Sequence, residues 1–137
     1  AQPESRAMET PTAAIQCREL RKTYVMGEVE VPVLRGVDVD IYGGELTVVL
    51  GASGAGKTTL LNIIGGIDRP TSGTVSFSGR DISRMSDREL TEHRRKNVGF
   101  VFQFYNLVPT LTALENVLVS TEVADDPMDP EKALDLV

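Results

Sequence analysis

Apolar positions in the first third of the chain recur at every second residue. Val37, Val39 and Ile41 fall on one side of the alternation, and Asp38 and Asp40 fall on the other. This is the period of a strand with one buried face. A looser alternation precedes it. The pattern therefore predicts two strands, at residues 15–24 and 31–41, joined by a turn at residues 26–30.

The middle of the chain contains short apolar runs bounded by turn residues. Four of the six residues of Glu45–Leu50 are apolar, and Val98–Phe102 contains no polar side chain, which is typical of buried strands. Thr74–Phe77 is interpreted as a shorter strand, and Ser78–Asp81 as the turn that follows it. We therefore expect three further strands after the opening pair.

Helix signals lie between and after these runs. The Gly65-Gly66 pair is a C-terminal signal, and Ser86 with Glu89 forms a capping box. Asp129 is placed to cap a last helix, with Pro130 in its first turn. The predicted helices are residues 59–64, 86 to about 96, 112 to about 119, and a helix that begins at residues 129–131.

Strand signals dominate the opening of the chain, and strands then alternate with helices. This order predicts an α/β fold with an antiparallel β portion at its front. The length of 137 residues suits one ordinary domain or a piece of a larger one. We expect residues 1–12 to be a polar tail without the features of a signal peptide, and residues 13–137 to form the domain.

Charge and composition exclude several classes of function. A net charge of −6 argues against a nucleic-acid binder that works through a general basic surface. The apolar runs are far shorter than the roughly 20 residues that span a bilayer. Cys17 is the single cysteine, so the chain forms no internal disulfide, and its strand-like surroundings predict a buried, inert thiol.

The candidate chemistry lies directly after Glu45–Leu50, in an octapeptide of the form G-x-x-x-x-G-K-T. Its glycines allow successive N–H groups to point inward around an anion, and the following helix adds its positive dipole end. Lys57 can reach the β- and γ-phosphates, and the Thr58 hydroxyl can ligate Mg²⁺. The alternative is a flexible turn that happens to contain a lysine. The predicted phosphate-binding residues are Gly51, Ala52, Ser53, Gly54, Ala55, Gly56, Lys57, Thr58 and Thr59.

Several segments in this order resemble the ATP-binding subunit of ABC transporters, which has a RecA-like P-loop NTPase core. They are Lys22–Tyr24, Leu34–Val37, Gly43–Glu45, the octapeptide, Pro70–Gly73 and Val98–Gln103. Within the family, Gly65–Asp68, Gln103–Pro109 and Leu114–Val117 are most similar to the lipoprotein-releasing and macrolide-export branch.

The resemblance implies roles for individual residues. Tyr24 would stack on the adenine of ATP, although packing at a strand end is the alternative. Gln103 would be the Q-loop glutamine, which assists Lys57 in catalysis and joins Thr58 on Mg²⁺. Its alternative is a polar residue that ends a strand. His93 lies among charged residues, so we expect it on a solvated helix face, without a catalytic role.

The resemblance also implies partners. These are a transmembrane transporter subunit, a second nucleotide-binding domain in a dimer, and no nucleic acid. The expected location is cytoplasmic, peripheral on the inner face of the membrane. Phe104, Tyr105 and Leu107 could equally be core residues or a patch that docks the membrane subunit.

Three motifs of the family are missing from the 137 residues: the signature sequence, the Asp-Glu pair after an apolar strand, and the switch histidine. The sequence therefore predicts a truncated ABC ATPase that binds nucleotide without turnover, from a parent that hydrolyses ATP for export or lipoprotein release. A stand-alone nucleotide-binding module is the alternative.

Overall fold

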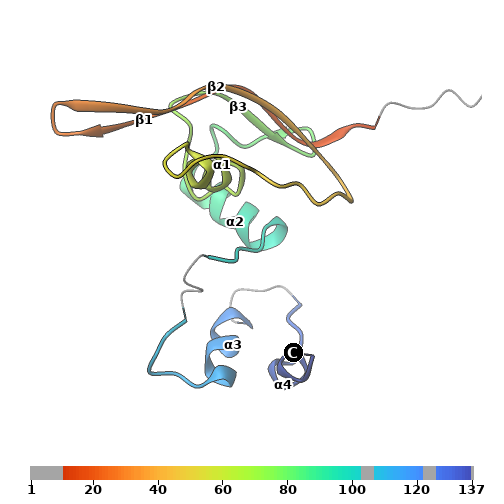
Figure 1. Cartoon of the computed structure of the whole chain (residues 1–137). Coiled ribbons are helices and arrows are strands. Elements are labelled where there is room, and N and C mark those ends of the chain that lie inside the picture. The colour runs from red at the N-terminus through yellow and green to blue at the C-terminus, as the bar shows by residue number, and fades with distance from the viewer. Residues whose placement is uncertain (1–10, 103–106, 122–125, 137) are drawn as a thin grey trace, which may run out of the picture. The chain divides into compact units, whose positions relative to one another are not determined.

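The computed structural model of the protein describes residues 11–102, 107–121 and 126–136. The chain divides into two compact units, Ala1–Ser86 and Asp87–Val137. The first unit contains a sheet and one helix, and the second contains helices (Figure 1). Each unit is described by itself below.

The first unit begins with a long antiparallel hairpin. Its strands are β1 (Ala13–Met26) and β2 (Val29–Tyr42). A two-residue turn joins them, and Gly27 adopts a positive φ of 65° there, a conformation that glycine reaches without steric cost. Both strands that the alternation predicts are confirmed, and each extends beyond its predicted bounds.

The hairpin is part of a four-stranded antiparallel sheet in the order β2-β1-β3-β4. Strand β3 spans Ser72–Phe77 and confirms the predicted strand there. The predicted turn over residues 78–81 is only half right. Arg80–Asp81 form the short strand β4, because they pair with the end of β3.

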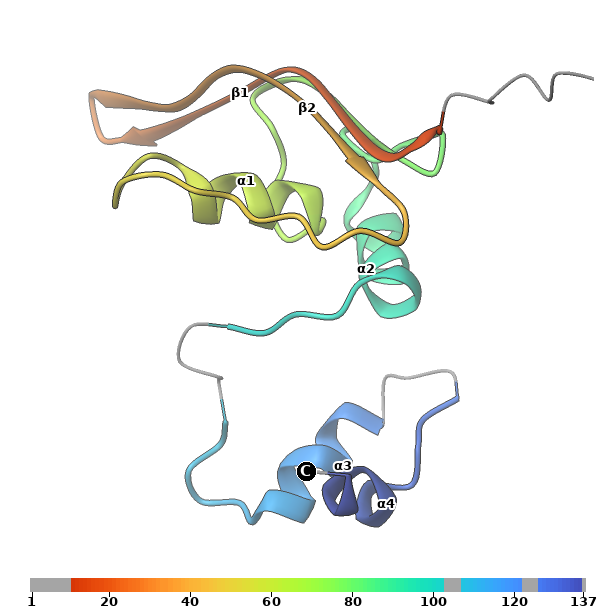
Figure 2. The ribbon, with the colours of Figure 1, turned by 45° about the vertical axis from the view of Figure 1, so that its right-hand side comes forward.

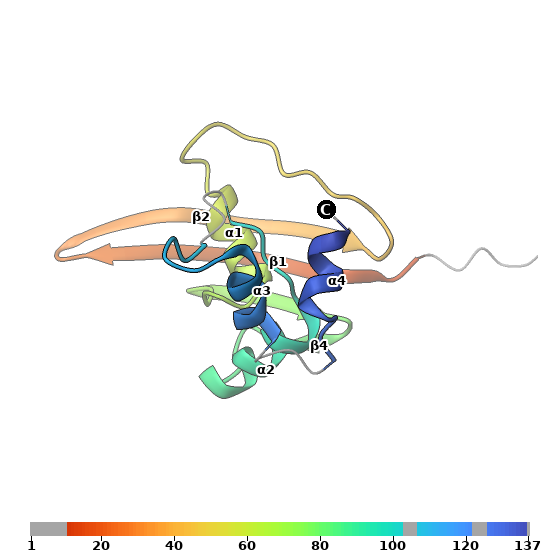
Figure 3. The ribbon, with the colours of Figure 1, turned by 90° about the horizontal axis from the view of Figure 1, so that it is seen from below.

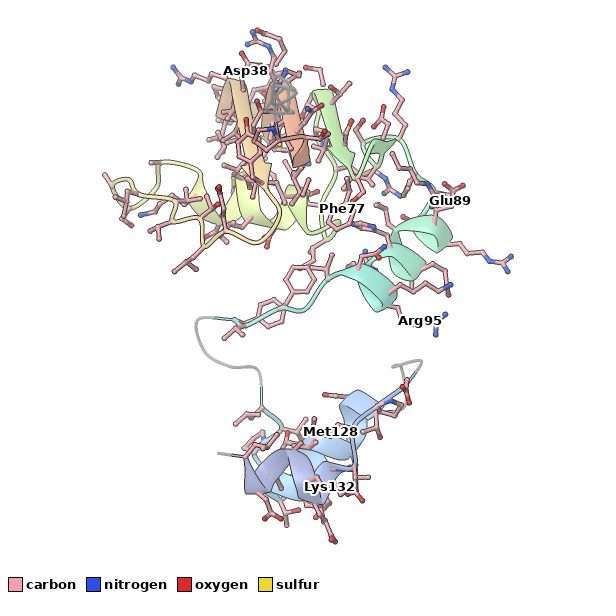
Figure 4. All side chains as sticks on the ribbon, turned by 90° about the vertical axis from the view of Figure 1, so that its right-hand side faces the viewer. Asp38, Phe77, Glu89, Arg95, Met128 and Lys132 are labelled. Carbon is pink, nitrogen blue, oxygen red and sulfur yellow. The ribbon has the colours of Figure 1, made fainter. Side chains whose placement is uncertain are left out.

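The two faces of the sheet differ as the alternation predicts. Asp38 and Asp40 are exposed, whereas Val37, Val39 and Ile41 are partly buried. Asp38 lies on the outer face of the sheet, away from the helix of this unit (Figure 4). The other face is therefore the one that carries the core.

Helix α1 (Lys57–Ile64) covers that inner face (Figure 2). It buries Leu60, Ile63 and Ile64, whose spacing of three and four residues places them on one side of a helix. The core residues of this unit are Ala13, Cys17, Leu20, Leu34, Leu60, Ile63, Ile64, Val75, Ile82 and Met85. Cys17 is fully buried, so the predicted burial of its thiol is confirmed.

The buried strand predicted at Glu45–Leu50 is wrong for this structure. The segment forms an open loop between the end of β2 and the start of α1 (Figure 3). Leu46, Val48 and Leu50 are 94%, 66% and 86% exposed. A strand needs a neighbour to satisfy its N–H and C=O groups, and no strand of the described residues pairs with this one.

The second unit begins with helix α2 (Asp87–Asn97). The predicted strand at Val98–Phe102 follows it and is also wrong: the segment has no regular secondary structure and no strand partner among the described residues, and Val101 is 88% exposed. The lack of a neighbouring strand is again the physical reason. Phe100 and Phe102 stack on each other there, with ring centroids 5.7 Å apart.

Helices α3 (Ala113–Thr121) and α4 (Pro130–Asp135) complete the second unit. The predicted Asp129 cap of α4 is confirmed, and Thr112 caps α3 in the same way. The Glu115 N–H donates to the Thr112 hydroxyl at 3.2 Å, and the Glu131 N–H donates to the Asp129 carboxylate at 2.9 Å. Met128 lies beside α4 in this unit, and Lys132 lies on that helix (Figure 4).

The solvated position predicted for His93 is wrong, because its side chain is only 6% exposed. His93 lies three residues after Leu90, the other buried residue of α2, so the two share one helix face. Asn97 contacts the His93 ring at 3.2 Å from the next turn. The charged neighbours in sequence occupy the other faces.

Candidate functional site

The predicted phosphate loop leads directly into the first turn of α1. Gly54 and Gly56 have positive φ values of 81° and 90°, which reverse the chain between the open loop and the helix. The Ala55 N–H donates to the Ala52 carbonyl at 3.1 Å, and the Leu60 N–H donates to the Gly56 carbonyl at 2.9 Å. The loop thus curls around the start of the helix.

Gly56 also fixes the loop against the sheet. It is the N-cap of α1, and a Cβ at this position would lie 3.1 Å from atoms of Val33 and Leu34 on β2. A glycine therefore allows the backbone to approach the strand closely. Because Gly56 has no side chain to cap the helix, the first N–H groups of α1 can bind an anion.

Lys57 folds back over the loop that precedes it. Its ammonium group donates to the carbonyl of Gly51, so the first and seventh residues of the octapeptide are in contact. The Lys57 side chain is partly buried, whereas Thr58 is exposed. This arrangement places one positive charge at the loop and one hydroxyl at the open end of the helix.

Tyr24 lies at the far end of β1 and reaches the same helix. Its hydroxyl is 3.5 Å from the Thr59 hydroxyl in the first turn of α1. The Tyr24 side chain is 36% exposed, so part of the aromatic ring remains available to a ligand. Residues 35 positions apart thus bring an aromatic surface and the predicted phosphate loop together.

Asp68 is the centre of a polar cluster behind Tyr24. Its carboxylate accepts from the Tyr24 hydroxyl at 3.0 Å and from the Lys22 ammonium at 3.0 Å. Partial burial raises the pKa of Asp68, but hydrogen bonds from Lys22, the Arg69 N–H and Tyr24 outweigh it. The net result is a lowered pKa. The carboxylate is therefore charged at neutral pH.

The remaining residues for which the sequence predicts a role lie outside the described residues or are exposed. Gln103, Phe104 and Tyr105 lie outside the described residues, so their predicted roles stay predictions. Leu107 is 67% exposed. Sequence reasoning missed Asp68. Its place at the end of the family-like segment Gly65–Asp68, just after the helix that follows the loop, gives no indication in the sequence of a contact with Tyr24.

One residue at the loop, Thr58, fits a bound Mg²⁺. In the described part of the chain, no three His, Cys, Asp or Glu side chains gather as a metal set. Mg²⁺ is commonly held by substrate phosphates, waters and one or two protein oxygens. The exposed Thr58 hydroxyl could supply one such oxygen.

Comparison with known proteins agrees with this geometry. Residues 34–137 match the family model described as "ABC transporter". The chain is 45% identical over 124 residues to the lipoprotein-releasing system ATP-binding protein LolD of Anaeromyxobacter dehalogenans, covering 90% of this chain and 51% of LolD. It is 44% identical over 110 residues to the macrolide export ATP-binding/permease protein MacB of Syntrophobacter fumaroxidans, covering 80% of this chain and 15% of MacB.

A solved structure is similar as well. It is the dimeric post-hydrolysis state of the ATP-binding cassette MJ0796 bound to ADP and Pi. It superposes with a TM-score of 0.80 at 40% identity, over 88% of this chain and 54% of that one. The chain spans about half the length of curated relatives such as LolD. None of the described helices is both long enough and apolar enough to cross a membrane.

Proposed function

The chain belongs to the ABC transporter family, and from this we propose that it binds Mg-ATP as part of a transporter's ATP-binding subunit. The phosphates lie on the backbone amides from Gly54 to Thr59, and Lys57 contacts the β- and γ-phosphates. The adenine stacks on Tyr24. Within the family, ATP supplies the free energy for transport.

One observation carries this proposal: the Tyr24 hydroxyl lies 3.5 Å from Thr59, at the start of the helix that follows the loop. This distance brings the ring that we propose for the base close to the N–H groups that we propose for the phosphates. Neither group alone would favour a nucleoside triphosphate over any other anion or aromatic molecule.

Mg²⁺ would be held by the phosphates, by waters and by the Thr58 hydroxyl, with the Gln103 amide oxygen as a further ligand. The ion supplies neutralisation of the phosphate charge. Lys57 adds a charge that remains with the protein. Gln103 is the residue that we propose to orient the attacking water in the parent protein.

Calorimetric titration with Mg-ATP tests the proposal. Lys57→Ala removes charge-assisted contacts and should weaken binding by on the order of a few kcal/mol. Lys132→Ala, which removes an exposed lysine of α4, is the matched control and should bind like the wild type. Equal affinity of the wild type and Lys57→Ala would contradict the proposal.

The proposal for the parent protein goes further. It would be a peripheral protein on the cytoplasmic face of a membrane, bound to a transmembrane subunit and paired with a second nucleotide-binding domain. The similarity to LolD and MacB supports lipoprotein release or export as the transport process. The dimeric MJ0796 cassette supports the pairing.

The 137-residue chain itself should bind ATP without turnover. Its sequence has no Asp-Glu pair to polarise water and no signature motif to close over a partner's nucleotide. This also leaves a stand-alone binding module as the second candidate. A steady-state phosphate-release assay on purified protein distinguishes binding from hydrolysis. Multiple turnovers that Lys57→Ala abolishes would contradict a binding-only chain.

A further inference from the structure

We propose that Asp68 is a positioning residue for nucleotide binding, because it fixes the ring of Tyr24 relative to the phosphate loop. The inference rests on the proposed function and adds a residue that does not touch the nucleotide itself. Asp68 lies just beyond the helix that follows the loop, and Tyr24 lies on β1, 44 residues earlier. Their contact therefore connects two separate parts of the first unit.

The contact restricts the ring at its outer end. The Tyr24 hydroxyl donates to one oxygen of the Asp68 carboxylate at 3.0 Å, and Lys22 donates to the other oxygen at 3.0 Å. Both oxygens of the carboxylate thus accept a side-chain hydrogen bond. A hydrogen bond to a charged acceptor is stronger than one between neutral groups, so the ring orientation is held firmly.

Lys22 determines which ring face is left for a base. Its ammonium lies over the Tyr24 ring, 5.0 Å from the centroid, and also donates to the Arg69 carbonyl at 2.7 Å. With its side chain only 15% exposed, Lys22 covers one face of the ring. A base would stack on the opposite face, and Asp68 keeps Lys22 in this position.

The backbone near Asp68 has anchors of its own. The Asp68 N–H donates to the Asn62 carbonyl at 3.2 Å, and the Thr71 N–H donates to the Arg21 carbonyl at 2.8 Å. The Thr23 N–H in turn donates to the Thr71 hydroxyl at 3.0 Å. Loss of the Asp68 carboxylate should therefore free Tyr24 and Lys22 while the connection between α1 and β3 keeps its path.

The inference predicts a separation between base binding and phosphate binding. We compare Mg-ATP and inorganic tripolyphosphate by calorimetry on the whole chain. Asp68→Ala and Tyr24→Phe should each weaken ATP about three- to tenfold, the size of a net hydrogen bond. Neither should change the affinity for tripolyphosphate. Asp68→Asn keeps an acceptor oxygen for Tyr24 and should recover part of the loss.

A double variant and a control complete the test. Asp68→Ala combined with Tyr24→Phe should lose no more ATP affinity than Asp68→Ala alone, because Asp68→Ala already removes the bond to the Tyr24 hydroxyl. Asp135→Ala, on α4 in the second unit, should bind like the wild type. Unchanged ATP affinity in Asp68→Ala, or an equal loss of tripolyphosphate affinity, would overturn the inference. A wild type that binds no Mg-ATP would instead overturn the proposed function.

Discussion

Tyr24 has three structural neighbours that decide how its substitution should be interpreted. Its hydroxyl contacts Asp68 and lies near Thr59, and its ring lies beneath Lys22. A tyrosine at a strand end can pack against its own strand alone. The Tyr24 hydroxyl instead lies near Thr59, in the helix that follows the phosphate loop. At the scale of single residues, this contact is what makes base stacking a specific prediction.

Tyr24→Ala should weaken Mg-ATP and leave pyrophosphate affinity nearly unchanged, because only the contact with the base is lost. Stacking of a base on an aromatic side chain contributes about 1–3 kcal/mol, which a calorimetric titration resolves. If Tyr24→Ala weakened ATP and pyrophosphate by the same factor, Tyr24 would be a structural residue.

Cys17 allows a prediction about pH. Burial raises the pKa of its thiol from 9.0 to about 11, against the opposing effect of Arg18. The thiolate is the reactive form, so alkylation by iodoacetamide should be slow at neutral pH, should rise about tenfold per pH unit, and should level off only near pH 11. The same measurement in denaturant should show an ordinary thiol. Rapid labelling of the folded chain near pH 8 would contradict this.

The phosphate loop could be predicted from the sequence because its residues are contiguous. Gly54, Gly56 and Lys57 define the motif without reference to the rest of the fold. Asp68 could not be predicted in the same way. Its contact with Tyr24 forms only when folding brings together two residues that are 44 positions apart in the sequence. A single aspartate in the sequence gives no indication of such a contact.

At the scale of elements, the hairpin and the unpaired segments show where pattern alone suffices. Strands β1 and β2 are neighbours in sequence and pair with each other, so their alternation is enough to predict them. Leu46–Leu50 has an equally strong apolar pattern, but a strand also requires a partner. The hydrophobic pattern states only that a segment prefers burial.

Gly73 sets how closely β3 can approach β1. Its φ is 86°, and a Cβ there would lie 2.3 Å from the carbonyl oxygen of Glu19. Glu19 itself has a positive φ of 47°, at a shift in the register of β1. Only a glycine allows this backbone contact between the two strands.

Gly73→Ala should therefore reduce the free energy of unfolding by at least about 2 kcal/mol, from backbone strain and overpacking together. Gly79→Ala is the matched control, since its φ of 82° is similar but no atom lies within 4 Å of the added Cβ. Gly79→Ala should reduce the free energy of unfolding by clearly less than Gly73→Ala does. If urea denaturation gave the same loss in the free energy of unfolding for both variants, the close approach of β3 to β1 would not explain the effect of Gly73→Ala.

At the scale of the whole chain, exposed apolar side chains are the dominant feature. Leu46 and Leu50 in the first unit and Val101 in the second are each more than 85% exposed. They belong to two segments without regular secondary structure, and the backbone groups of these segments have no strand partner among the described residues. Such segments present an edge and an apolar surface at once, which favours pairing with another chain.

The isolated chain should therefore self-associate as its concentration rises and should unfold at a low temperature, because unburied apolar surface does not offset the entropy of ordering. Leu46→Glu combined with Val101→Glu should reduce the association in sedimentation velocity. Leu136→Glu changes an exposed leucine at the C-terminal end of α4. It is the control and should leave the association unchanged. A monodisperse wild-type monomer with a high melting temperature would contradict the link between these two segments and association.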